Sequence, residues 1–124
     1  MNHEDFRRMA LALSGAVEGA HMGHPDFRVK NRIFATIHPD PTHGMVKLTP
    51  DQQHVFVRDF PTIFIPENGA WGRAGCTRVM FSEADEEVLG EVATLAWQNV
   101  MQEQVARSAK KKTSTTRRPL QKAR

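Results

Sequence analysis

Short apolar segments, separated by glycines and prolines, fill the middle of this chain and limit it to short strands. The segment 26–30 alternates apolar and basic side chains, 32–37 is an apolar run suited to burial on both faces, and 45–48 is a third strand. A tight turn is expected at Asn31-Arg32. Because short turns join these strands, the pattern favours an antiparallel meander over parallel βαβ units.

Helical patterns are confined to three segments. Residues 2–14 place apolar side chains at helical spacing, and Asn2 is positioned to cap the first turn. Thr49-Pro50-Asp51 combines a cap, a proline at the first helical position and an acid, which predicts a second helix. Ser82 is expected to open the last helix, which should fade near Arg107.

Two further strands, 63–65 and 77–81, complete the pattern, whereas the glycine-rich stretch 15–25 is expected to be an irregular connection. The element order is then α-β-β-β-α-β-β-α. The predicted fold class is α+β, a two-layer arrangement in which helices cover one face of a five-stranded, mainly antiparallel sheet.

Positive charge is concentrated at the C-terminal end. Of the 17 Lys and Arg residues, eight lie in 107–124, which contains no acid; the other nine share residues 1–106 with all 14 acidic residues, so that part has a net charge of −5. A chain of 124 residues is about one domain. The basic segment has too few apolar residues to offset the entropy of ordering. We therefore expect a domain over 1–106 and a disordered basic tail over 107–124.

Several classes of function are not expected. No apolar run approaches the roughly 20 residues of a membrane span, the N-terminus is too polar for a signal peptide, and the single Cys76 allows no internal disulfide, so the cytoplasm is the expected compartment. The sequence has no Walker loop, dinucleotide fingerprint or nucleophile elbow, and we expect neither an enzyme nor a cofactor. The pairs His21/His24 and His38/His43 lack further ligands at an established spacing, so no metal site is expected.

Several segments, in the right order, resemble the MmcQ/YjbR family. They are Gly23 to Val29, Arg32 to Thr36, Val46 to Pro50 and, most distinctively, Gly69 to Val79. The resemblance covers about 1–101 and leaves out the basic tail. It implies a two-layer fold similar to secretion chaperones and to the frataxin-like CyaY shape, and DNA binding through a double-wing arrangement. It implies no catalytic residues.

The glycine-rich loop before the last strand is the first candidate site. Trp71 lies between glycines with Arg73 and Arg78 nearby, an arrangement in which the indole stacks on a base and the arginines contact phosphate. Alternatively, Trp71 anchors the loop to the core while Gly72 and Gly75 supply backbone angles that other residues avoid. Both interpretations stay open at this point.

The strand cations are the second candidate site. Arg28, Lys30, Arg32 and Lys47, with Arg78, would form a basic patch if they share one sheet face. The alternative is a solvated face or an edge that charge protects against aggregation.

The basic tail is the third candidate. Its cations suit nucleic acid or another polyanion, and the alternative is a solubilising extension without a specific partner. The candidate contacts in the tail are Lys110, Lys111, Lys112, Arg117 and Arg118.

Two functions of different classes follow. The leading hypothesis is weak nucleic-acid binding with little sequence selectivity through the loop, the strand cations and the tail. The alternative is a protein-interaction or chaperone-like module, for example a homodimer surface, if Phe34, Phe64 and Met80 lie on the uncovered sheet face. The acidic run from Glu83 to Glu91 is expected at the solvated start of the last helix, where acids complement the helix dipole.

Overall fold

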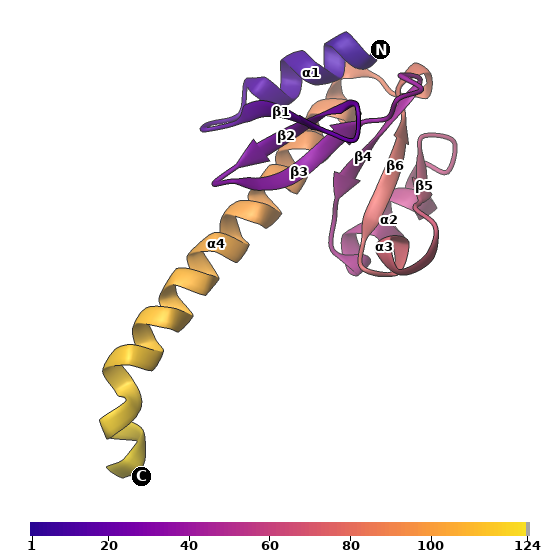
Figure 1. The fold of residues 1–124 in the computed structure, drawn as a ribbon. Helices are drawn as coiled ribbons and strands as arrows, with labels where there is room; N and C mark the ends of the chain where they lie inside the picture. Colours follow the sequence, from indigo (N-terminus) through magenta and orange to yellow (C-terminus); the bar gives the residue numbers. More distant parts are fainter. Residues whose placement is uncertain (124) are drawn as a thin grey trace.

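A single antiparallel sheet of six strands forms the centre of the molecule (Figure 1). The computed structural model describes the backbone of residues 1–123 and the side chains of residues 1–107. Neighbouring strands follow the order β1-β2-β3-β4-β6-β5. Their bounds are β1 (Val17–His21), β2 (His24–Val29), β3 (Arg32–Ile37), β4 (His43–Lys47), β5 (Phe64–Pro66) and β6 (Cys76–Met80).

The helices gather mainly on one side of this sheet. Helix α4 packs across β2, β3 and β4, α1 packs on α4, and α2 packs on β5 (Figure 1). Their bounds are α1 (His3–Leu11), α2 (Pro50–Asp59), α3 (Gly69–Arg73), the 3₁₀ turn η1 (Phe81–Glu83) and α4 (Glu86–Ala123). The predicted two-layer α+β class is confirmed. The predicted number of five strands is wrong, because β1 makes a sixth.

Side-chain caps explain where the helices begin. Asn2 accepts a hydrogen bond from the Asp5 backbone N–H, and the Asp5 carboxylate accepts one from the Asn2 N–H, which completes a capping box. Asp85, rather than Ser82, caps α4, because its carboxylate accepts a 2.9 Å hydrogen bond from the Val88 N–H. Ser82 lies instead in η1.

The turn between β2 and β3 lies one residue earlier than predicted. Its two residues are Lys30 and Asn31, with φ of 54° and 64°. Two consecutive left-handed residues form the kind of turn whose twist matches an antiparallel hairpin. Lys30 is exposed at the tip of the β2–β3 hairpin, so its side chain does not share the sheet face of Arg28.

A bulge in β3 brings one more phenylalanine into the core. Phe27 pairs with Ala35 and Arg28 pairs with Ile33, so Phe34 is the additional residue of β3. Phe34 is 0% exposed and Phe64 is 1% exposed, both in the core. The expectation that they lie on the uncovered sheet face is therefore wrong.

Strand β1 was missed because its sequence, Val-Glu-Gly-Ala-His, has low strand propensity and is mostly exposed. It is held by its pairing with β2, from Val17↔Arg28 to His21↔His24. Met22 and Gly23 connect the two strands with φ of 50° and 83°, again a left-handed pair. The strand is thus specified by its turn and its neighbour.

Helix α4 continues to Ala123 and extends away from the sheet (Figure 1), past the end that was predicted near Arg107. Its Ala, Lys, Arg and Gln residues have high helix propensity. Among the residues whose side chains are described, the last in α4 that pack on the core are Val100 and Met101. The separate disordered tail over 107–124 stays a prediction. The side chains of Lys110, Lys111, Lys112, Arg117 and Arg118 lie outside the described residues.

Candidate functional site

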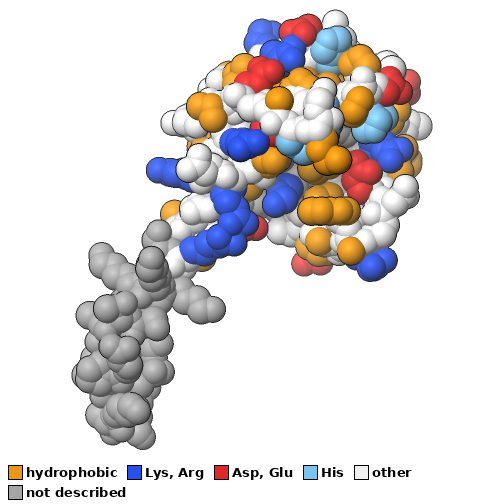
Figure 2. Space-filling view, viewed as in Figure 1, with side chains coloured by type: hydrophobic (Ala, Val, Ile, Leu, Met, Phe, Trp, Pro, Cys, Tyr) orange, Lys and Arg blue, Asp and Glu red, His pale blue; other side chains and the backbone are white. Residues whose placement is uncertain are grey.

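The face of the sheet turned away from α1 and α4, here called the open face, carries polar and basic side chains from every inner strand. Strand pairing places Met45 beside Arg78 and Lys47 beside Cys76. Arg28 lies opposite Ile33 on the same face. Figure 2 shows Lys, Arg and His side chains interleaved with hydrophobic ones over the sheet.

A hollow of about 670 Å³, here called the basin, lies on this open face. Its volume is within the roughly 300–1,000 Å³ range of small-ligand sites. Of the predicted site residues, the basin brings together Arg28, Arg32, Lys47 and Trp71. The residues that line it are His21, His24, Arg28, Asn31, Arg32, Ile33, Thr36, His38, Met45, Lys47, Glu67, Asn68, Trp71 and Cys76.

Trp71 stands on the short helix α3 at the side of the basin. The structure forms α3 where the sequence predicted a loop. Trp71 is 70% exposed, so the alternative that it anchors the loop to the core is wrong. An indole with this exposure presents a flat apolar surface to solvent and to any ligand in the basin.

The backbone around Trp71 is held by glycines and by one glutamine. A Cβ at Gly72 would overlap the carbonyl oxygen of Glu67, and Gly75 combines a φ of 115° with a close approach to Leu48. The side-chain amide of Gln53, on α2, donates to the carbonyl oxygens of Gly72 and Cys76, each at 3.0 Å. These contacts fix the position from which Trp71 projects.

The candidate cations in and around the open face differ in their ion-pair partners. Arg28 binds Asp26 (Nε to Oδ1, 2.7 Å), Arg32 lies 3.7 Å from Glu103, and Arg78 binds Glu67 at 3.1 Å. Within residues 1–107, Lys30, Lys47 and Arg73 form no ion pair. Lys47 is therefore the basin cation that is most available to a ligand.

Asp26 is a buried carboxylate beneath this surface. Its side chain is 0% exposed and receives two hydrogen bonds from Arg28 and one, of 2.7 Å, from His21 Nδ1. The bonds from Arg28, and then that from His21, lower the pKa of Asp26 despite the opposing effect of burial. Asp26 therefore stays ionised and orients Arg28 and His21 at the basin.

Four histidines form a row across one end of the sheet, from β1 to β4. The rings of His21 and His24 lie 4.4 Å apart between centroids, and those of His38 and His43 stack at 4.2 Å. His24 Nδ1 lies 3.0 Å from the Ile37 carbonyl oxygen, and can only donate to it. Burial, together with the charges of His38 and Arg78, lowers the pKa of His43. His21, His24 and His38 bring polar imidazole nitrogens to the basin, whereas the buried His43 is not part of its lining.

Cys76 lies in the basin but is poorly suited to nucleophilic chemistry. The side chain is buried, and this burial raises the pKa of the thiol. A thiol of raised pKa is less ionised near neutral pH, and the thiolate is the reactive form.

Three predicted contacts fall outside the basin lining. Arg78 is on the open face beside it, where its Nε is buried and has no hydrogen-bond partner among the described residues. Lys30 is at the β2–β3 turn, and Arg73 is exposed at the end of α3. Arg28, Lys47 and Arg78 thus share the open face, whereas Arg32 pairs with the buried Val29 and reaches Glu103 on α4, so it borders the basin from the edge of the sheet. The prediction of one shared sheet face is therefore wrong for Arg32 and Lys30.

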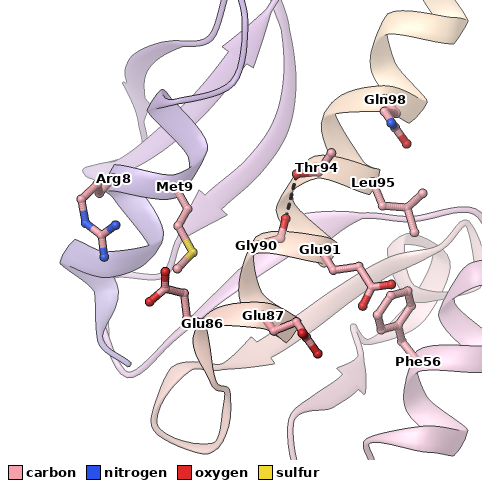
Figure 3. Close-up of a pocket in the computed structure, with 10 residues that line it drawn as sticks. All are labelled: Arg8, Met9, Phe56, Glu86, Glu87, Gly90, Glu91, Thr94, Leu95 and Gln98. Carbon is pink, nitrogen blue, oxygen red and sulfur yellow. Dashed lines mark hydrogen bonds between the residues drawn. The ribbon is translucent and has the colours of Figure 1, made fainter.

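A second hollow, of about 900 Å³, lies on the helical side between α1, α2 and α4 and is here called the helical groove (Figure 3). Glu86, Glu87 and Glu91 line it together with Arg8 and Phe56. Figure 3 shows the carboxylate of Glu91 beside the Phe56 ring. This groove is acidic, in contrast to the basin.

Metal and membrane sites were searched among the described residues. In that part of the chain, no three His, Cys, Asp or Glu side chains are grouped so that they could hold a metal ion. The helices described here include none with the length and apolar character needed to span a bilayer.

Sequence reasoning missed the contributions of Asp26, His21, His24 and His38 to this site. The sequence did contain one signal: His24, Asp26 and Arg28 are every second residue of β2, and alternate residues of a strand share a face. The pairing with His21 depends on β1, which the sequence pattern did not predict.

A family model described as YjbR matches residues 11–99. The crystal structure of the Deinococcus radiodurans protein DR2400, with the family-model domain DUF419, is similar at a TM-score of 0.65 and 21% sequence identity. The match covers 78% of this chain and 76% of that one, and at this identity it shows a shared fold alone. No curated protein matches the chain.

Proposed function

The chain belongs to the MmcQ/YjbR family, and we propose that this member binds nucleic acid on its open face, weakly and with little sequence selectivity. The observation that carries the proposal is the basin, in which Arg28, Arg32 and Lys47 lie together with an exposed Trp71. Cations that contact phosphate and an aromatic surface that stacks on bases are the two elements of sequence-tolerant nucleic-acid binding.

The distribution of charge supports this choice of ligand. Six of the nine cations in residues 1–106 belong to the sheet, its turns or α3, namely Arg28, Lys30, Arg32, Lys47, Arg73 and Arg78. The acids that lie among them, Asp26 and Glu67, are already paired with arginines. The open face therefore offers positive charge to a polyanion although this part of the chain is net negative.

The same ion pairs account for weak binding. A phosphate that approaches Arg28 or Arg32 competes with Asp26 or Glu103 for the guanidinium. Phosphate contacts position a nucleic acid without reading its sequence, which accounts for the low selectivity. The tail cations would add further sequence-independent attraction, and a single buried cysteine suits action in the cytoplasm.

The protein-interaction or chaperone-like alternative has less support. It required an apolar open face. Met80 does lie on that face, because it alternates with Arg78 along β6, but Phe34 and Phe64 are buried in the core, and Arg28 and Lys47 line the basin. We therefore retain nucleic-acid binding as the proposal.

Fluorescence anisotropy with labelled oligonucleotides over a range of salt concentrations tests the proposal. The full chain and a chain ending at Ala106 are compared, since the last packed residue of α4 is Met101. We expect both to bind at low salt, with log K falling against log[salt] at a slope of about −3.6 for the full chain if about four phosphates are neutralised. The absence of binding by both chains in dilute buffer would rule the proposal out. Binding by the full chain alone would assign it to the tail and not to the open face.

A further inference from the structure

We propose that the nucleic acid bound at the open face is single-stranded, with one base stacked on Trp71 and its flanking phosphates on Lys47 and Arg32. This inference rests on the proposed function and specifies its substrate class. It depends on how Trp71 is exposed, on what lies on either side of it, and on which cations are near.

The exposure of Trp71 is supported by a rigid local backbone. Among the large hydrophobic side chains of the described residues, only Met22 is more exposed. Gly72 and Gly75 allow close backbone contacts that a side chain would prevent, and Gln53 binds the carbonyl oxygens of Gly72 and Cys76. The backbone that carries the indole is therefore fixed before any ligand arrives, so binding has only the Trp71 side chain to order.

Trp71 stands between two hollows. One is the basin, and the other, of about 370 Å³, lies toward α4 and includes Asn99 and Glu103 in its lining. Lys47, Trp71 and Cys76 line both hollows. A chain of nucleotides that passes from one hollow to the other therefore crosses the indole and passes Lys47.

Duplex nucleic acid does not suit this arrangement. In a duplex the bases are stacked on each other, and a side chain can stack on one only if that base is unpaired and turned outward. A single strand presents its bases at little cost, and each base stacked on an aromatic side chain contributes about 1–3 kcal/mol as judged by alanine substitution. Two cations of the basin supply positive charge beside the stacked base. Lys47 has no ion-pair partner within residues 1–107, and the Arg32 guanidinium lies 3.7 Å from the Glu103 carboxylate.

The full chain carries two tryptophans, and this permits a direct test. Trp97 lies on α4 and donates to the Ser14 carbonyl oxygen at 2.8 Å, away from the basin lining. A Trp97→Phe variant leaves Trp71 as the sole tryptophan fluorophore. Into this variant we would titrate a thymidine oligonucleotide of about ten nucleotides, a random-sequence duplex of the same length and thymidine monophosphate.

We expect the single strand to quench Trp71 fluorescence and to bind at least about tenfold more tightly than the duplex. Trp71→Ala in the full chain should weaken single-strand binding by about 5- to 150-fold, and Trp71→Phe should weaken it less. Because Trp71 is largely exposed, neither substitution should change the melting curve, and circular dichroism checks this.

Four results would overturn the inference. Equal or tighter binding of the duplex, or single-strand binding without a change in Trp71 emission, would reject the stacking site while the proposed function stands. Saturation by the monophosphate at the affinity of the oligonucleotide would replace the strand by a mononucleotide ligand. Failure of both oligonucleotides to bind the full chain would reject the proposed function together with the inference.

Discussion

The basin and the helical groove are two hollows of one small molecule, and they differ in charge. The basin is lined by Arg28, Arg32 and Lys47, and the groove by Glu86, Glu87 and Glu91. The groove acids are exposed, and Glu86 and Glu87 lie in the first turn of α4, where they complement the helix dipole. The one buried carboxylate of the open face, Asp26, is instead bonded to Arg28 and His21.

This contrast shows why net charge is a poor guide to the partner of this domain. Residues 1–106 are net negative, with nine cations and 14 acids. The fold places six of those cations on the sheet, its turns or α3, and it places Glu86, Glu87 and Glu91 on the helical side. A polyanion therefore meets an attractive face and a repulsive face, and rotation of the molecule decides which is encountered.

The largest expected effect concerns the backbone beneath each hollow. In Gly72→Ala, beside the basin, the added methyl overlaps the Glu67 carbonyl oxygen, so unfolding free energy should fall by about 3 kcal/mol or more. The matched control is Gly90→Ala in α4 at the helical groove, where nothing lies near the new Cβ. There we expect a gain of about 0.5–1 kcal/mol, because glycine weakens a helix interior. Urea denaturation of both variants measures this, and similar small effects would show that α3 is not rigidly held.

The second prediction compares a buried ion pair with an exposed one. The folded-state pKa of Asp26 is lowered, first by Arg28, so its stabilising contribution is present above about pH 4 and is lost as the pH falls further. Asp26→Asn should cost about 1–3 kcal/mol at pH 7 and should flatten the acid limb of the stability curve. Asp59→Asn, which removes the exposed partner of Arg58 on the helical side, should leave that limb almost unchanged. Thermal melts from pH 7 to about pH 3 make the measurement, and equal acid limbs for both variants would contradict the assigned role of Asp26.

The third prediction reverses one cation in each hollow. Lys47→Glu in the basin should weaken single-strand binding by about tenfold and reduce the salt slope by about one. Arg8→Glu in the helical groove changes the net charge equally, but should alter affinity by less than about twofold. Anisotropy titrations at two salt concentrations compare them. If both variants lose the same affinity, net charge and not the open face controls binding.

Much of the fold was predictable from local chemistry. The capping residues Asn2 and Thr49 marked two helix starts, and the alternation that placed Phe27 and Val29 opposite Arg28 is confirmed by their burial. Strand β1 was not predictable in this way, because its residues contribute little to the core and the strand exists through pairing with β2. Strand propensity is a property of the residue itself, whereas the pairing that forms β1 depends on the neighbouring strand β2.

The candidate site was predicted in part for the same reason. Arg28, Arg32, Lys47 and Trp71 were chosen by residue type, and the tertiary structure brings them together around the basin. The row of histidines was considered as separate pairs and set aside, because only the order of the strands reveals that His21 and His24 lie beside His38 and His43. The backbone that carries Trp71 is set partly by the contact of Gly75 with Leu48, which is distant in sequence, so local chemistry could not decide whether the indole points inward or outward.

The smallest expected effect tests whether Glu103 competes with a bound phosphate for Arg32, or whether only the net charge of the protein matters. Glu103 lies 3.7 Å from Arg32, and its carboxylate is about half exposed, so the pair contributes little to stability. A phosphate at Arg32 must nevertheless displace it. Glu103→Gln should therefore tighten single-strand binding about two- to threefold at low salt, because it frees Arg32 and removes a repulsive charge beside the smaller hollow.

Glu87→Gln is the matched control for this change. It removes the same charge from the helical groove (Figure 3), whose lining does not include Arg32. If the bound strand lies over Trp71 toward α4, only Glu103→Gln tightens binding, and the gain disappears in an Arg32→Ala background. Equal gains from both variants would mean that the polyanion senses only the total charge, and the path across Trp71 would then lose its electrostatic support.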